Sequence, residues 1–267
     1  METVLISWFE ALVLGVVQGL TEFLPVSSSA HVFIVSEFFG WGDPGAAFTA
    51  VTQIGTETAV IIYFRKDIAK LFKSFVGWFR VPETRGTSET NLVWAIIWGS
   101  LPIGIIGFLA QDIIEGDIRN LDLVASMLIL FGAFLILVER IKIKPKGELT
   151  LKSGILMGFA QALALIPGVS RSGATITAGL ALGLSRESAT RYAFLLAIPA
   201  VMASGFLEAF KISGSAVAWG PTLLATAISS VVGYAVIAGL LNFLKNHSFA
   251  IFGVYRILLG LLIFIVF

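Results

Sequence analysis

Long apolar stretches, separated by charged segments, run through most of this chain. Six of them have close to the roughly 17–25 residues that a helix needs to cross the hydrocarbon of a bilayer. They are residues 48–64, 92–111, 123–138, 190–210, 219–243 and 250–267. We therefore predict an all-α polytopic membrane protein, a single integral membrane domain over residues 1–267 with about six full transmembrane helices.

Two more apolar segments are each interrupted by a proline and a short polar turn. The first runs over residues 4–24 and resumes at about 30–40, and the second runs over 153–166 and resumes at 172–184. All but the first of these four pieces are too short to cross a bilayer. Non-helical backbone at that depth is tolerated only where it is buried in protein or lines a wet cavity. We therefore expect two re-entrant helical hairpins, each with a polar turn at depth.

These two interrupted segments are copies of one another, related by a constant shift of 143 residues. The shift matches Gly15 to Gly158, Gln18 to Gln161, Ser27 to Ser170, Ser28 to Arg171 and Ser29 to Ser172. Two such turns inside an apolar chain predict a buried polar site built from two related halves.

The basic residues predict how the chain is oriented. Loops 65–91 and 139–152 are rich in lysine and arginine, whereas 112–122 is acidic, so the first two are expected to be cytoplasmic and the third external. Three spans, an odd number, separate the two hairpins, which should therefore enter from opposite sides. This predicts an inverted-topology repeat, with repeat one over about 4–138, repeat two over about 153–267 and the turns meeting near the midplane.

Aromatic residues are interspersed with lysines over residues 66–80. This pattern favours an amphipathic helix lying in the membrane interface. The alternative is an ordinary charged loop.

Composition supports a membrane protein and excludes several other classes. Hydrophobic residues make up 57% of the chain and charged residues 13%, about half the charged fraction of a typical soluble domain. Mean hydropathy is +0.93. A net charge of +1 gives no reason to expect nucleic acid as a partner, and the absence of cysteine excludes disulfides and thiolate metal sites.

The second polar turn has the chemistry of an anion site. Ser170 or Ser172 is expected to cap the outgoing helix, whose N-terminal N–H groups and dipole favour an anion. Arg171 adds a planar set of donors that matches phosphate oxygens, and Thr175 points the same way one turn later. Together with Gly173 these are the predicted substrate contacts of this turn. The alternative for Arg171 is a purely structural brace on backbone carbonyls.

The first polar turn collects groups that can attack a substrate or move a proton. Ser27 or Ser28 is expected to cap the outgoing helix, and His31 shares a face with both. A lone buried histidine is more often structural than catalytic, but beside these serines we interpret His31 as functional. Ser27 and Ser29 are the predicted substrate contacts on this side, and Ser28 is a candidate nucleophile.

Gln18 and Glu22 lie four residues apart on the incoming helix and share a face. Their amide and carboxylate oxygens, together with waters, would suit Mg²⁺ or Ca²⁺. Gln53 and Glu57 are also four residues apart, and the sequence leaves open whether they line the same cavity or pair with a neighbouring helix. Arg256, near the start of the last stretch, is interpreted as an anchor at the membrane interface.

The two turns are complementary, since one supplies a cation and N–H donors and the other supplies proton-moving groups. Positioning and charge neutralisation are most of what phosphoryl transfer requires. Apolar walls near headgroup depth suggest a phosphate carried by a lipid.

At these residues the chain resembles the bacitracin-resistance family of undecaprenyl-pyrophosphate phosphatases. The family's first motif corresponds to Gln18–Glu22, continued by Phe23–Ser28 with a histidine shortly after, here His31. Its second motif, Pro-Gly-x-Ser-Arg-Ser-Gly-Ala-Thr, is complete at Pro167–Thr175. Two positions depart from the pattern: Gln18 stands where some members have glutamate, and Ala30 stands where glycine is common.

The resemblance implies hydrolysis of undecaprenyl diphosphate to undecaprenyl phosphate and inorganic phosphate, with Mg²⁺ or Ca²⁺ as cofactor. It implies a multi-pass protein of the bacterial cytoplasmic (inner) membrane with its active site toward the external side. By position, Glu22, His31 and Arg171 would be the essential residues. Ser28 would be a nucleophile or phosphate ligand, and the remaining phosphate contacts would be Ser27, Ser170, Ser172 and Thr175.

Our hypothesis is that Arg171 and the nearby helix N-termini grip the diphosphate while Glu22 and Gln18 hold the divalent ion. Ser28, or a water, then attacks the terminal phosphorus, and His31 moves the proton. The main alternative is a transporter or flippase of a phosphorylated lipid, because broken helices in inverted repeats are typical of transporters. Histidine-based membrane lipid phosphatases are rejected because they need two motif histidines. Preferred metal, prenyl length selectivity and the existence of a homodimer are left open.

Overall fold

The computed structural model describes residues 6–110, 120–141, 143, 149–211 and 218–266. This part of the chain is helical and contains no strand, as predicted. The helices are α1 (Trp8–Thr21), α2 (Ser28–Phe38), α3 (Gly45–Tyr63), α4 (Arg65–Arg80), α5 (Ser88–Leu109), α7 (Leu121–Ile141), α8 (Leu151–Ala162), α9 (Arg171–Ala181), α10 (Arg186–Lys211), α11 (Trp219–Phe243) and α12 (Ala250–Val266), with short 3₁₀ turns η1 (Pro82–Thr84) and η2 (Leu163–Leu165).

Every one of the six predicted apolar stretches is a helix: α3, α5, α7, α10, α11 and α12. Four of them, α5, α7, α10 and α11, are long and apolar enough to cross a membrane by length and composition. Of the other two, α12 is a shorter apolar helix, and α3 carries the polar side chains of Gln53 and Glu57 in its middle. The coarse prediction of a polytopic helical membrane protein is therefore confirmed.

The packing of the first half is echoed in the second. α1 packs along α11 and α8 packs along α5, while α3 packs on α10 and α7 packs on α12. The matched glycines explain the first two contacts: Gly15 lies against the backbone of Ala225, and Gly158 lies against the backbone of Gly99. A Cβ at either glycine would collide with that backbone, so the same close helix approach is built twice.

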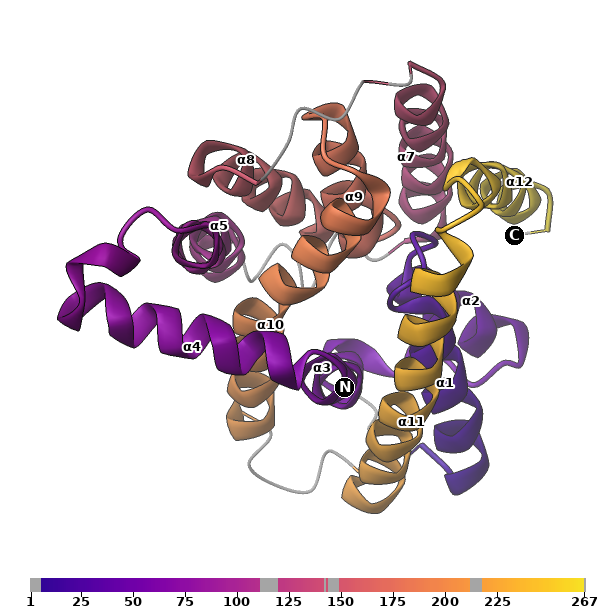
Figure 1. The fold of residues 1–267 in the computed structure, drawn as a ribbon. Coiled ribbons are helices and arrows are strands. Elements are labelled where there is room, and N and C mark those ends of the chain that lie inside the picture. Colours follow the sequence, from indigo (N-terminus) through magenta and orange to yellow (C-terminus); the bar gives the residue numbers. More distant parts are fainter. Residues whose placement is uncertain (1–5, 111–119, 142, 144–148, 212–217, 267) are drawn as a thin grey trace.

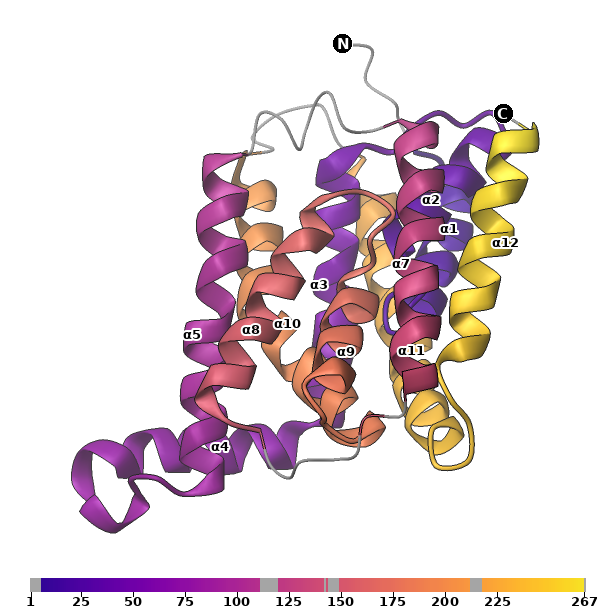
Figure 2. The same cartoon turned by 90° about the horizontal axis from the view of Figure 1, so that it is seen from above.

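Figure 1 shows α4 lying across the bundle, and Figure 2 places it at one end of the other helices. The predicted helix over 66–80 is therefore confirmed, and none of its residues is buried. Phe72 and Phe79 are exposed on it, whereas Trp78 packs edge-on against Trp94 of α5. The loops that carry the orientation prediction lie partly outside the described residues, because 111–119, 142 and 144–148 are not among them.

Both polar turns lie between short helices that fold back on each other, α1 with α2 and α8 with α9. In Figure 2 the α8–α9 pair opens toward the end where α4 lies, and the α1–α2 pair lies toward the opposite end. Each second helix follows a serine with a positive φ, Ser27 at 72° and Ser170 at 70°. Among the described residues other than glycine, only these two have a positive φ.

Arg256 is not an interface anchor, so that prediction is wrong. Its side chain is completely buried, and Nη2 donates to the carbonyl oxygens of Gly168 at 2.9 Å and Val169 at 2.8 Å. Nη1 donates to the carbonyl oxygen of Pro25 at 3.4 Å in the other turn. Bent backbone without its own helical partners leaves carbonyls to satisfy, and one guanidinium serves both turns. The brace role weighed above for Arg171 belongs to Arg256.

Candidate active site

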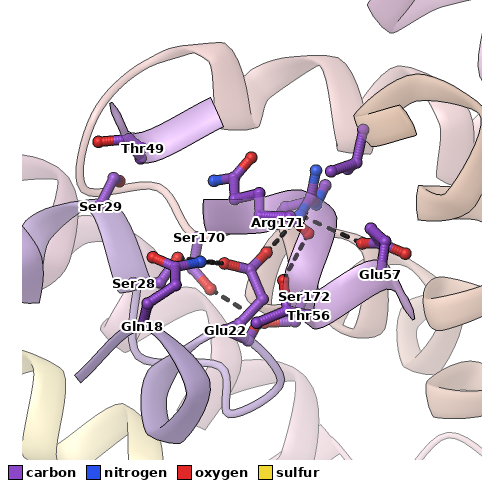
Figure 3. A network of polar contacts seen from close by, with 12 residues as sticks. Gln18, Glu22, Ser28, Ser29, Thr49, Thr56, Glu57, Ser170, Arg171 and Ser172 are labelled. Carbon is purple, nitrogen blue, oxygen red and sulfur yellow. Dashed lines mark hydrogen bonds and ion pairs between the residues drawn. The ribbon is translucent and has the colours of Figure 1, made fainter. Parts of the chain in front are cut away.

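The two polar turns meet at Glu22 (Figure 3). Ser172 Oγ, from the second turn, donates to the carbonyl oxygens of Leu24 at 3.0 Å and Glu22 at 3.2 Å in the first. Arg171 Nη2 forms an ion pair with Glu22 Oε1. Residues separated by about half of the sequence thus lie side by side, as the repeat predicted.

Glu22 binds three donors at once. Its Oε1 accepts from Arg171, and its Oε2 accepts from Ser28 Oγ at 2.5 Å and from Gln18 Nε2 at 2.6 Å. The carboxylate is buried, so it depends on these charge-assisted bonds in place of water. A serine hydroxyl that donates to a buried carboxylate is in position to lose its proton to that carboxylate.

Ser28 and Arg171 are the first residues of α2 and α9, and each directly follows a serine with a positive φ. Ser170 caps α9 as expected, since its Oγ accepts from the Gly173 N–H at 3.1 Å. Ser27 occupies the same position before α2 without a side-chain cap bond. N–H groups at both helix starts remain available to an anion.

A cavity of about 430 Å³ opens beside these groups. Its polar end is lined by Glu22, Ser27, Ser28, Ser29, Ser170 and Arg171, with Gln53 of α3 nearby. Its apolar walls come from α5 and α10, including Ile103, Gly104, Gly107, Phe108, Ala200, Ala203 and Leu207. Such a cavity fits a ligand with a charged head and an apolar tail.

Three predicted substrate contacts lie behind the turn and do not line this cavity. Ser172 bonds the backbone of the first turn, and Thr175 Oγ1 donates to the carbonyl oxygen of Arg171 at 2.8 Å. Gly173 lies against Ser170 and the guanidinium of Arg256, where a Cβ would collide. In this arrangement these residues shape the turn that presents Arg171.

His31 also lies away from the cavity. Its Nδ1 is 2.7 Å from the carbonyl oxygen of Ser27, and its Nε2 is 2.7 Å from the hydroxyl of Tyr255 on α12. The two rings stack with centroids 5.6 Å apart. Both ring nitrogens are therefore engaged with groups other than Ser28 or Glu22. Tyr255 was not anticipated, because no sequence signal links positions 224 residues apart.

Glu57 does join the site, which the sequence left open. It is buried on α3, and its Oε1 lies 3.5 Å from Arg171 Nη2. A carboxylate in the middle of an apolar stretch was the available signal, but its partner could not be read from the sequence.

The donor set fits a divalent ion that is held partly by its substrate. Gln18 contacts Glu22 through Nε2, and its Oε1 is buried with no hydrogen-bond partner. Across the described residues no three of His, Cys, Asp and Glu gather as a complete ion site. Mg²⁺ commonly takes only one or two protein carboxylates and completes its shell with phosphate and water.

The model of the family described as "Bacitracin resistance protein BacA" matches residues 11–262. The chain belongs to this family. It is 52% identical over 275 residues to undecaprenyl-diphosphatase 2 of Streptomyces avermitilis. The alignment covers 96% of this chain and 94% of that relative. It is also 52% identical to the undecaprenyl-diphosphatase of a Nocardioides species (96% and 95% covered) and 50% identical to that of Streptomyces griseus (97% and 94% covered). The resemblance first seen in the two motifs therefore extends over nearly the whole chain.

Proposed function

We propose that this chain is an integral membrane phosphatase that hydrolyses undecaprenyl diphosphate to undecaprenyl phosphate and inorganic phosphate. This reaction recycles the lipid carrier of cell-wall synthesis. Family membership and the names of relatives about 50% identical support the activity. The observation that carries the proposal is one carboxylate, Glu22, that joins the Ser28 hydroxyl to the Arg171 guanidinium at the polar end of a half-apolar cavity.

Arg171 is the proposed clamp for the diphosphate. Its planar fork matches phosphate oxygens, and it begins α9, whose N-terminal N–H groups add to the same field. Ser170, Ser27 and Ser29 line the same end of the cavity and supply further hydrogen bonds. The apolar walls of α5 and α10 would accommodate the first part of the polyprenyl chain.

Ser28 is the proposed nucleophile and Glu22 its base. As the bond from Oγ to the terminal phosphorus forms, the bond from that phosphorus to the oxygen of the lipid phosphate breaks. The Ser28 proton passes to Glu22 Oε2, which it already contacts. Water then releases phosphate from the serine. Direct attack by a water on the same line, with Glu22 again as base, is the alternative route.

His31 is proposed to hold the first turn and to affect catalysis through it. Its bond to the Ser27 carbonyl oxygen helps maintain the positive φ of Ser27, which sets the direction of Ser28. This assigns the proton transfer at Ser28 to Glu22, because Glu22 is the group in contact.

Gln18 and Glu22 are the proposed protein ligands of Mg²⁺ or Ca²⁺. The unpartnered Gln18 Oε1 supports this assignment. When bound, the ion would neutralise charge on the phosphate oxygens. Because the side chain of Gln18 is an uncharged amide, it would bind the ion as a neutral ligand and cannot act as a base.

We also propose that α1–α2 and α8–α9 are re-entrant hairpins of an inverted repeat, with repeat one over about 4–138 and repeat two over about 153–267. The paired contacts of the two halves and the opposed hairpins support it. In this arrangement six helices span the bacterial cytoplasmic membrane, α4 lies in the cytoplasmic interface, and the site opens toward the external side. Whether two copies form a homodimer is a separate question for light scattering in detergent.

Phosphate release from detergent-purified protein and undecaprenyl diphosphate tests the activity. We expect steady release that EDTA suppresses and that falls by about a hundredfold or more in Ser28→Ala. Trapping a phosphoenzyme in the parent, and finding none in Ser28→Ala, would select serine over water. The transporter alternative predicts the reverse pattern: lipid crosses proteoliposome membranes and no phosphate is released.

A further inference from the structure

Arg171 lies between two carboxylates, and only one of them faces the main cavity. Glu22 and Arg171 line the cavity of about 430 Å³, whereas Glu57 does not. Glu57 lines a much smaller void of about 10 Å³ on the other side, together with Glu22, Arg171 and Phe194. Figure 3 shows Glu57 approaching Arg171 from the side opposite to Ser28. Glu57 therefore lies behind the clamp, outside the lining of the main cavity.

The Glu57 carboxylate is buried and has few polar neighbours. Its side chain is 1% exposed, and its Oε2 is buried without a hydrogen-bond partner. Within the described part of the chain, its ion pair is with Arg171. A buried carboxylate in an apolar helix is costly and marks a functional site by default.

Glu22 and Glu57 differ in what else they bind. Glu22 also accepts from Ser28 and Gln18, so it must change its interactions as the reaction proceeds. Once it receives the Ser28 proton, its attraction for the guanidinium falls. Glu57 makes no bond to Ser28 or Gln18 among the described contacts, so its hold on Arg171 does not change at that moment.

We infer that Glu57 is a positioning residue for the phosphatase proposed above: its carboxylate keeps Arg171 directed at the cavity while Glu22 exchanges partners. The charge of Glu57, and not its volume, is what the site uses. Because Glu57 acts through Arg171, its effect should vanish when Arg171 can no longer form a fork.

Two substitutions separate charge from shape. Glu57→Gln keeps the size and removes the charge, whereas Glu57→Asp keeps the charge and leaves a small gap. We expect phosphate release to fall about tenfold or more in Glu57→Gln and to be better retained in Glu57→Asp. A packing role predicts the opposite order, since the isosteric amide would then be tolerated best. That opposite order, or full activity in Glu57→Gln, would overturn the inference.

Binding of inorganic pyrophosphate by calorimetry provides a readout that needs no turnover. We expect about tenfold weaker binding in Glu57→Gln and near-normal binding in Glu57→Asp. Tighter binding in Glu57→Gln would mean that Glu57 only repels the anion, which would overturn the inference. An inactive parent protein that still shows this binding order would contradict the proposed function and support the role of Glu57.

The Arg171→Lys background tests the route of the effect. In Arg171→Lys protein, Glu57→Gln should change pyrophosphate affinity by less than about threefold, because the guanidinium that Glu57 orients is absent. Equal losses in both backgrounds would show that Glu57 does not act through Arg171. Thr52→Val, another buried polar position on α3, is the matched control and should leave affinity and activity unchanged.

Discussion

The turn between α1 and α2 can be compared position by position with the turn between α8 and α9. In each, a serine with a φ near 70° precedes the second helix, Ser27 in one and Ser170 in the other. The next residue, which begins that helix, is Ser28 in the first and Arg171 in the second. One backbone design is used twice, and the same position carries the proposed nucleophile in one copy and the proposed clamp in the other.

The incoming helices differ in a corresponding way. Gln18 donates to Glu22, four residues later, whereas the residue four after Gln161 is the apolar Leu165. Gln161 is as buried as Gln18, yet neither its amide nitrogen nor its amide oxygen has a partner. The difference teaches that the duplicated scaffold constrains the backbone and leaves side chains free to diverge. Glu22 and Arg171 each occur in one copy only, with Leu165 and Ser28 at the equivalent positions.

The largest expected effect comes from removing the side chain that distinguishes the second turn. Arg171→Ala should reduce phosphate release by about a thousandfold or more, because it removes the clamp and leaves Glu22 and Glu57 buried without their cation. The assay is phosphate release at saturating and limiting undecaprenyl diphosphate. Arg191→Ala is the control, since Arg191 is partly exposed, pairs with Asp67 and does not line the cavity. Retention of most activity in Arg171→Ala would show that Arg171 is not the clamp for the diphosphate.

An intermediate effect is expected at the group that joins the two turns. Arg256→Leu leaves the carbonyls of Gly168 and Val169 without their donor in a buried place. The free energy of unfolding should fall by about 2–4 kcal/mol. Thermal unfolding in detergent measures this, with Arg140→Leu at the end of α7 as a control. An unchanged midpoint would mean that the turns hold their shape without the brace.

The smallest effects are expected at the two matched glutamines, where the same substitution should lower activity at one position and leave it unchanged at the other. Gln18→Leu should lower activity about tenfold, because Glu22 loses a donor and the proposed ion loses an oxygen ligand. Gln161→Leu should leave activity unchanged and raise thermal stability slightly, because it removes a buried amide without partners. Equal behaviour of the two variants in the phosphate assay would contradict the assigned asymmetry.

Local signals in the sequence were enough for the helices and for the two turns. Apolar length predicted α5, α7, α10 and α11, and the prolines with their serines predicted where each hairpin bends. Internal similarity also predicted that Ser28 and Arg171 would converge, because the expected inverted repeat would bring equivalent turns together. These features depend on neighbouring residues or on a shift that can be read directly.

Partners chosen by tertiary packing could not be predicted in the same way. Arg256 was misassigned because its carbonyl partners lie 87 to 231 residues away, and a position near the start of an apolar stretch resembles an interface anchor. His31 lies three residues after Ser28 on α2, as expected, but its ring nitrogens contact the Ser27 carbonyl oxygen and the Tyr255 hydroxyl and not Ser28. Tyr255 comes from another helix, 224 residues away, so this contact could not be predicted from the spacing within the first turn.

The backbone angles of Ser27 and Ser170 carry a consequence for how this protein can be improved. Glycine adopts such angles freely, whereas serine stores of the order of 1 kcal/mol in each. Exchanging either serine for glycine would relax the chain but delete a hydroxyl from the cavity wall. Thermostable variants selected without regard to turnover should therefore accumulate glycine at these two positions, and each gain in durability would be matched by slower chemistry.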